Sequence, residues 1–162
     1  MRFLIATALC LCSTLPVNAA LLISTPAEVC SLLNEHGLAT RGWRNPDGLG
    51  FYCSSPYKQI GAGFPLANNL AYYVDGTSTT VRQVKLVLNI NDRNTATAAH
   101  NELLNAATAL TLKVIGAQLP KVVRSAITSG GKASQKVGSA IVEVNRIDWP
   151  TGKGYEVKVI IK

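Results

Sequence analysis

The chain has 162 residues, of which 48% are apolar and 15% are charged. This composition excludes an intrinsically disordered protein and indicates a single domain with a sizeable packed core. The formal net charge is +7, but no two basic residues are adjacent. A clustered basic surface with interleaved aromatic residues is therefore missing, and no nucleic-acid partner is expected. The basic residues are interpreted as a solvated surface, and the alternative is that the net positive charge favours acidic partners or an anionic membrane surface through long-range steering.

The first 19 residues have the layout of a cleaved secretory signal peptide. Arg2 precedes an apolar run over residues 3–12, and small residues follow up to Ala19. This run is shorter than the about 20 residues that a membrane span needs. We expect cleavage after Ala19 or Ala20, a single domain over residues 20–162, and no stable membrane anchor after cleavage. A retained anchor is the alternative. The expected location is the bacterial periplasm or the external medium.

Cysteine usage agrees with export. Cys10 and Cys12 each follow a leucine, which argues against lipidation, and both leave with the signal segment. The mature chain keeps Cys30 and Cys53, and a pair of cysteines in an oxidising compartment indicates one disulfide. It would close a loop of about 24 residues and stabilise the fold by about 3 kcal/mol. The alternative, a nucleophilic thiol at Cys53, is disfavoured by export.

The first predicted helix has a complete start signal. Thr25 is placed as the N-cap, Pro26 occupies the first helical position, and Glu28 completes a capping box. Gly37 is expected to end this helix in a left-handed conformation.

A hairpin and a loop are predicted next. Asn-Pro-Asp-Gly at residues 45–48 predicts a turn between strands at 39–44 and 49–54. Cys53 lies on the second strand, so the disulfide would join the first helix to this hairpin. Residues 56–65 begin and end with proline and contain Gly61 and Gly63, so they are predicted as a loop.

The clearest pattern covers residues 68–112. Apolar and polar residues alternate on both sides of Asp75-Gly76, which predicts an antiparallel hairpin with one covered face and one mostly hydrated face. Apolar residues then recur every three or four positions from Ala96 to Val114, which predicts an amphipathic helix. Much of its stripe is alanine, so this helix can lie close to the sheet.

The C-terminal part is predicted as a helix and a hairpin. A shorter helix begins near Pro120 and ends at Gly130-Gly131. Residues 132–136 are interpreted as a polar connector. The last hairpin has strands at 137–147 and 155–161.

These elements predict an α+β fold in which an antiparallel sheet of about six strands, arranged in hairpins, carries two to three helices on one face. The opposite face would then present a mixture of aromatic, aliphatic and charged side chains, which suits a protein interface. The candidate protein-binding residues on it are Tyr73, Gln83, Lys85, Val87, Asn89 and Lys158. The alternative is a partly solvated face that a loop covers.

The sequence contains no recognisable catalytic motif. Its two histidines, His36 and His100, have no carboxylate at a spacing that suggests a triad or a metal pair. Zinc-ligand spacings, a phosphate-binding loop and a GxSxG elbow are also missing. We therefore predict no catalytic residue, no metal and no cofactor, and we expect structural or surface roles for both histidines.

One resemblance extends over residues 43–126. The segment NNLAYYVDG, followed by VKLVLNIN and a helix of the form AxxAHNELLNAATAL, resembles small exported bacterial proteins of unknown function. The resemblance implies location and fold rather than activity. The order of helices and strands is also similar to that of secretion chaperones, but those act in the cytoplasm, which the export signal contradicts.

The sequence as a whole favours an exported, non-enzymatic protein-binding domain. An immunity or inhibitor-type protein of the periplasm would fit, with a toxin, a hydrolase or an envelope component as its partner. One alternative is an accessory subunit of an envelope or secretion machine. Another is a small hydrolase that uses His100 with an acidic partner.

Overall fold

A computed structural model describes residues 21–22, 25–63 and 66–162. The predicted signal segment at residues 1–19 and the end of the predicted loop at residues 64–65 lie outside these ranges. Among the described residues, no helix combines the length and the apolar character that crossing a membrane requires.

Within these ranges the chain forms a seven-stranded sheet with three α-helices and two short 3₁₀ turns. In chain order these are α1 (Pro26–Ser31), η1 (Asn34–His36), β1 (Phe51–Ser54), β2 (Lys58–Ile60), β3 (Asn68–Gly76), β4 (Val81–Ile90), η2 (Arg93–Thr95), α2 (Ala96–Ile115), α3 (Lys121–Ser129), β5 (Ala133–Val137), β6 (Ala140–Asp148) and β7 (Tyr155–Ile161).

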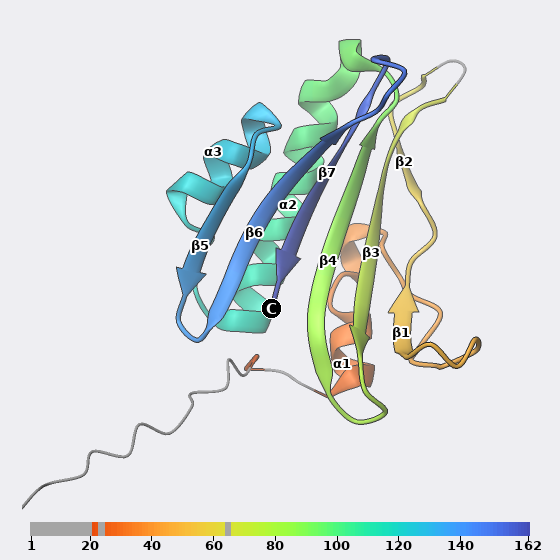
Figure 1. Ribbon diagram of the computed structural model, residues 1–162, viewed down its shortest axis with the longest axis vertical. Helices are drawn as coiled ribbons and strands as arrows, with labels where there is room; N and C mark the ends of the chain where they lie inside the picture. The colour runs from red at the N-terminus through yellow and green to blue at the C-terminus, as the bar shows by residue number, and fades with distance from the viewer. Residues whose placement is uncertain (1–20, 23–24, 64–65) are drawn as a thin grey trace, which may run out of the picture.

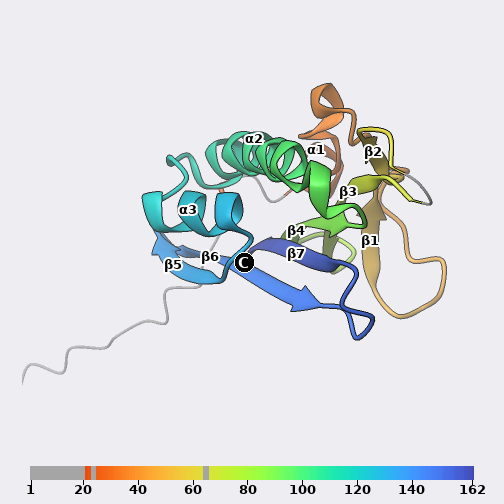
Figure 2. The same ribbon diagram turned by 90° about the horizontal axis from the view of Figure 1, so that it is seen from above.

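All strand pairs are antiparallel, in the order β1-β3-β4-β7-β6-β5, and β2 pairs with the other end of β3. The three helices lie on one side of this sheet, as the view from above shows (Figures 1 and 2). The predicted α+β class is therefore confirmed, with seven strands in place of about six. The hairpin patterns left the pairing order open, and the structure places β7, the last strand, between β4 and β6.

The core lies between the sheet and α2. Leu70 and Tyr72 of β3, Leu86 of β4 and Val159 of β7 point toward the helices and are fully buried. The alanine stripe of α2 is buried as predicted, for example Ala99, which has no exposed surface. Small side chains let the helix axis approach the sheet closely, so that large side chains from the strands fill the space between the two layers.

The first helix differs from its prediction. The side chain of Thr25 makes no capping hydrogen bond, and α1 ends at Ser31. Leu33 leaves the helical conformation, and the chain continues as η1, which Gly37 ends with a φ of 72°. The predicted single helix is therefore broken. The bend allows Leu33 and Leu38, on either side of η1, to enter the core with no exposed surface.

Two predictions around the first strand were also wrong. Residues 39–44 form no strand, and only Arg44 bridges to Tyr52 of β1. The predicted loop at 56–65 contains β2, which pairs with β3 beside its residues 68–70. Because β1 covers only residues 73–76 of β3, the remaining backbone of this strand needs a partner, and β2 supplies it.

The connector predicted at residues 132–136 is the edge strand β5, which joins β6 through a turn at Gly138 and Ser139. The predicted strand at 137–147 is therefore two strands. Ser134, Gln135 and Lys136 are all exposed, because β5 lies at the border of the sheet. A strand with so little burial lacks the apolar alternation on which the sequence prediction relied.

Candidate functional site

The side of the sheet away from the helices, here called the open face, carries all six candidate binding residues. Tyr73 of β3 lies directly opposite Lys85 of β4, and Val87 lies between Ala71 of β3 and Lys158 of β7. Gln83 and Asn89 occupy the same face of β4, since side chains on one face of a strand recur every second residue. This side faces the viewer in Figure 1.

An aromatic and cationic cluster forms one row of the open face. The Lys85 ammonium lies 5.3 Å from the centre of the Tyr73 ring, within the range of a cation–π interaction. The Tyr73 hydroxyl donates to the Tyr57 hydroxyl at 3.3 Å. Burial, with a smaller contribution from the bond to Tyr57, raises the pKa of Tyr73 well above its usual range. The Tyr73 phenol therefore stays a neutral hydrogen-bonding group.

The remaining polar side chains of the open face are held in place by hydrogen bonds or an ion pair. The Asn89 amide donates to the Asn69 side-chain oxygen at 2.9 Å, and the Gln83 amide donates to the Asp75 carboxylate at 2.8 Å. Lys158 pairs with its neighbour Glu156, with 2.8 Å between nitrogen and oxygen. These contacts fix side chains that would otherwise lose rotamer freedom on binding, which lowers the entropic cost of association.

Val87 is the one candidate that neighbouring groups cover. It is only 6% exposed, and Ala71 beside it is not exposed at all. Both lie beneath the longer side chains of the open face. Val87 therefore supports the surface from below, and a partner would first touch the residues around it.

The list of candidate residues leaves out several members of this surface, and for Tyr57, Asn69 and Asp75 the contact with a candidate depends on pairing between strands. Tyr57, Asn69, Asp75 and Glu156 all contact one of the candidates. Asp75 also borders a hollow of about 340 Å³ between the segment before β1 and the β3–β4 turn. Its lining is Asp47, Leu49, Gly50, Phe51, Tyr52, Asp75, Gly76 and Arg82. Leu49 is 90% exposed there.

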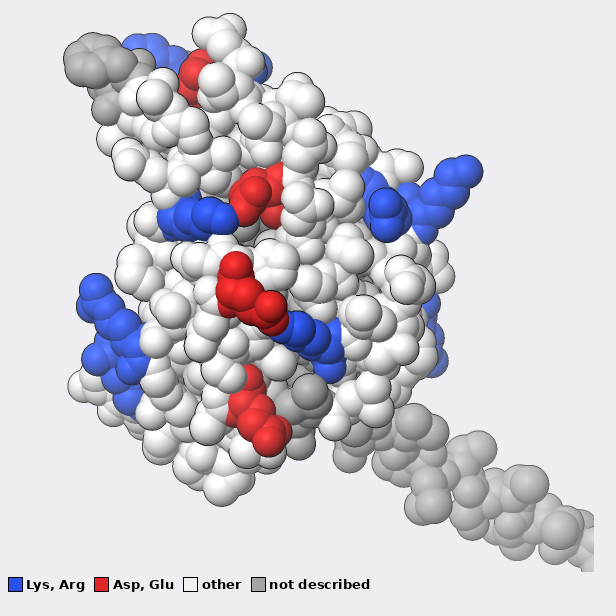
Figure 3. Space-filling view, turned by 180° about the vertical axis from the view of Figure 1, so that it is seen from behind, with Lys and Arg blue, Asp and Glu red and all other residues white. Residues whose placement is uncertain are grey.

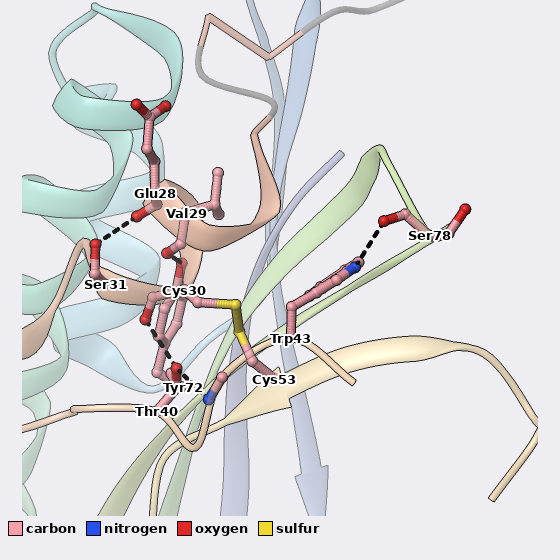
Figure 4. The surroundings of a disulfide bond; sticks show 10 residues. Glu28, Val29, Cys30, Ser31, Thr40, Trp43, Cys53, Tyr72 and Ser78 are labelled. Atoms are coloured by element: carbon pink, nitrogen blue, oxygen red, sulfur yellow. Dashed lines mark hydrogen bonds between the residues drawn. A yellow bond between two sulfur atoms is a disulfide. The ribbon is translucent and has the colours of Figure 1, made fainter. Parts of the chain in front are cut away.

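The predicted disulfide between Cys30 and Cys53 is present and joins α1 to β1 (Figure 4). This bond removes the alternative of a free nucleophilic thiol at Cys53. Beside it, the Tyr72 hydroxyl donates to the Val29 carbonyl at 2.8 Å. The Trp43 indole nitrogen donates to the Ser78 carbonyl at 3.3 Å. These contacts attach the N-terminal segment to the sheet, so the disulfide has a structural position away from the open face.

His100 is buried within the helix layer. Its Nδ1 lies 2.5 Å from the Ile127 carbonyl of α3, and its Nε2 lies 2.9 Å from the Tyr155 hydroxyl of β7. Since a carbonyl only accepts, Nδ1 carries the proton and Nε2 accepts from Tyr155. The Arg146 guanidinium stacks on the Tyr155 ring at 3.7 Å and pairs with Asp148. Neither ring nitrogen of His100 bonds to a carboxylate, so the structure shows no histidine–acid pair of the kind that the hydrolase alternative requires. His36 is half-buried at the end of η1.

This environment predicts an acid-sensitive contact. Burial, together with the nearby charge of Arg146, lowers the pKa of His100 from its usual 6.5, although the bond to Ile127 opposes this shift. The neutral ring therefore contributes stability above pH 6.5, which is lost as the pH falls below that value. The slope for one proton is at most about 1.4 kcal/mol per pH unit.

Urea denaturation of the wild type and of His100→Asn at pH 7.5, 6.5 and 5.5 would measure this effect. Asparagine keeps a donor for the Ile127 carbonyl but does not titrate, so the variant should lose less stability than the wild type between pH 6.5 and 5.5. Asn105→Ala, a substitution at an exposed position on α2 that involves no titratable group, is the control and should retain the slope of the wild type. Identical slopes in the wild type and His100→Asn would contradict the assignment.

The helix side of the molecule carries no single large patch of one charge. Figure 3 shows cations and anions scattered over it, several of them side by side. Two ion pairs link elements there: Lys58 of β2 pairs with Glu102 of α2, and Lys113 of α2 pairs with Glu35 of η1 at 2.6 Å. Among the described residues, no group of three or more His, Cys, Asp or Glu side chains is placed to hold a metal ion.

Comparison with known proteins identifies a family for this chain. Neither a curated protein sequence nor a solved structure matches the chain. The family model described as "Family of unknown function (DUF6030)" matches residues 19–146, which run from the end of the predicted signal segment to within β6. The match therefore does not include β7, the strand that carries Lys158. Since it spans most of the 162 residues, the chain belongs to this family of unknown function, DUF6030.

Proposed function

We propose that this protein is an exported, non-enzymatic protein-binding domain that grips its partner with the open face of its sheet. An immunity or inhibitor-type protein of the bacterial periplasm fits this description best. The observation that carries the proposal is the ordered cluster of Tyr57, Tyr73 and Lys85 on a sheet face that no described helix covers.

The composition of the open face supports protein binding. Tyrosine is enriched in protein interfaces because its ring offers a large contact area, while only two side-chain torsions must be fixed on binding. Tyr57 is 59% exposed and lies against Tyr73, so the pair presents both apolar rings and hydroxyls. Lys85, which makes no ion pair within the described residues, adds positive charge, which would steer an acidic surface of the partner toward the face.

Two observations support export. The disulfide Cys30–Cys53 belongs to the kind of cross-link that persists in oxidising compartments. Residues 1–19 have the charge and apolar pattern of a signal peptide. A periplasmic or secreted protein accounts for both.

Site-specific photo-crosslinking in the producing cell tests the proposal. With a photo-reactive residue at Lys85, we expect one discrete adduct with another protein. The control position Asn105 is exposed on α2, on the helix side, and should give none. Adding Tyr73→Ala to the Lys85 variant should reduce the adduct by about tenfold or more, the loss expected for an aromatic contact residue.

The result of the crosslinking experiment distinguishes between the proposed roles. An adduct of equal yield at both positions, or none at Lys85, would contradict binding through the open face. A toxin or hydrolase in the adduct supports the immunity or inhibitor role. An envelope or secretion component would replace that role with the accessory-subunit alternative.

A further inference from the structure

The strand β5 forms one border of the sheet. This strand is the last in the strand order, pairs only with β6, and lies at the margin of the molecule in Figure 1. Its register is continuous from Ala133, opposite Val144, to Val137, opposite Ala140, without a bulge or a proline. Such an edge presents backbone N–H and C=O groups that can pair with a further strand.

The opposite border of the sheet is better protected. There β1 and β2 are only four and three residues long, and both pair with β3. Beyond β1, the backbone of Arg44 exchanges two hydrogen bonds with Tyr52, at 3.1 and 2.9 Å. This border is therefore partly closed, which leaves β5 as the more accessible edge.

The backbone geometry of β5 shows which groups are available. Val137 and Ala140 close a two-residue turn, so alternate residues of β5 bond to β6 and the others, Ser134 and Lys136, direct their backbone groups outward. The Gln135 side chain donates to the Lys136 carbonyl at 3.3 Å. The Gln135 side chain thus occupies the Lys136 carbonyl, which could otherwise accept a hydrogen bond from the N–H of an added strand.

This edge and the helix α3 beside it carry several cations. The nearest carboxylates are Glu143, opposite Ser134, and Asp148, near Lys132, and they pair with Lys162 and Arg146. Residues 103–142 include no aspartate or glutamate, but they include five lysines or arginines. One of these, Lys113, pairs with Glu35. The other four cations are exposed and make no ion pair within the described part of the chain. They lie on α3, on β5 and between these elements: Lys121, Arg124, Lys132 and Lys136. The helix α3 packs against β5, so all four belong to one border of the domain (Figure 2).

We infer that β5 is a strand-addition site for an extended, acidic segment of a partner protein. The backbone of that segment would pair with Ser134 and Lys136, and its carboxylates would meet the four cations. Main-chain bonds supply affinity in this mode of recognition, and side chains supply selectivity. The site goes beyond the proposed function, because it lies at the sheet edge and uses none of the open-face candidates.

Two other occupants fit the observations less well. A second copy of the chain, paired edge to edge, would bring two sets of the same four cations together, and like charges repel. An anionic membrane surface would attract the cations but would leave the backbone groups of β5 without hydrogen-bonding partners in the apolar region. Val122 is the only large, strongly exposed apolar residue on α3, which leaves little area to insert.

The test uses the mature protein labelled with ¹⁵N and a synthetic peptide of alternating glutamate and threonine, about ten residues long, enough to span an average strand. At saturating peptide, amide hydrogen exchange at Ser134 and Lys136 should slow by about tenfold or more, because each amide gains a protected hydrogen bond. A control peptide of the same charge, with proline in place of threonine and N-methylglutamate in place of glutamate, has no backbone donor within its chain on either edge and should give no protection.

Two variants test the contacts one by one. Reversal of charge in Lys132→Glu/Lys136→Glu should weaken peptide binding by about tenfold or more. The control Arg41→Glu/Lys153→Glu has the same net charge at exposed positions away from β5 and should change it little. Ser134→Pro removes an outward N–H and should abolish protection at Lys136. Its circular dichroism and melting temperature report whether the edge strand tolerates proline. If Ser134→Pro does not fold, the comparison of the Lys132→Glu/Lys136→Glu variant with its charge-reversal control tests the inference.

Three outcomes would overturn the inference. If the proline peptide binds as tightly as the glutamate–threonine peptide, binding arises from charge alone and not from strand pairing. Protection of the Ser134 and Lys136 amides that depends on protein concentration without peptide would identify a second copy as the occupant. Tighter binding to phosphatidylglycerol vesicles than to the acidic peptide would identify a membrane surface. None of these results bears on crosslinking at Lys85, so this site and the proposed function can fail separately.

Discussion

Replacing Cys30 and Cys53 together with alanine is expected to lower the free energy of unfolding by about 3 kcal/mol. The disulfide links residues 23 positions apart and ties α1 to the edge strand β1. Without it, the unfolded chain gains the conformational freedom of that loop. The short helix α1 would then depend on contacts such as the hydrogen bond from Tyr72 to Val29.

Urea denaturation of the mature double variant and of the oxidised wild type measures this loss. The wild type after reduction is the matched control and should unfold at nearly the same urea concentration as the variant. Thiol labelling of the native protein should find no free cysteine before reduction. A difference in unfolding free energy below about 1 kcal/mol would show that α1 and the segment after it stay in place without the disulfide.

Leu86→Ala is expected to destabilise the fold by about 2–5 kcal/mol, the range for truncating a buried leucine. Leu86 lies on β4, opposite Tyr72 of β3 and Val159 of β7, and all three are fully buried beneath the helix layer. The closely packed neighbours can collapse only partly into the space that the side chain leaves. The variant should unfold at a clearly lower urea concentration while keeping the same dependence on urea.

The same substitution at Leu112 provides the control. Leu112 lies on α2 but is 50% exposed, so removing its side chain leaves no enclosed cavity. Its loss should stay within about 0.5 kcal/mol, as is usual for surface substitutions. Equal losses at the two positions would contradict the placement of the core between β4 and α2.

The open face was predictable from sequence because it depends only on alternation within single strands. Once β3, β4 and β7 are recognised, a period of two decides which residues share a face, whatever the strand order. Tyr73, Lys85, Asn89 and Lys158 therefore lie together as expected. Their partners Tyr57 and Asn69 were missed, because a contact between strands requires the register of pairing, which no local pattern contains.

The edge strands show a second limit of local patterns. Both β2 and β5 were interpreted as irregular segments, since most of their residues are half-buried or exposed. Their extended conformation comes from backbone pairing with β3 and β6, which satisfies N–H and C=O groups regardless of side chain. The further interaction site at β5 followed only when this pairing was known.

By itself, the sequence determined the α+β class, the central hairpin with its amphipathic helix, the disulfide between Cys30 and Cys53, and the composition of the open face. Each of these depends on burial patterns or on residue chemistry that repeats over short distances. The tertiary structure alone decided the place of β7 between β4 and β6, the break after α1, and the enclosure of His100 by Ile127 and Tyr155. The physical reason is that these features arise where segments distant in the chain compete for the same core and the same backbone partners, and local preference does not decide that competition.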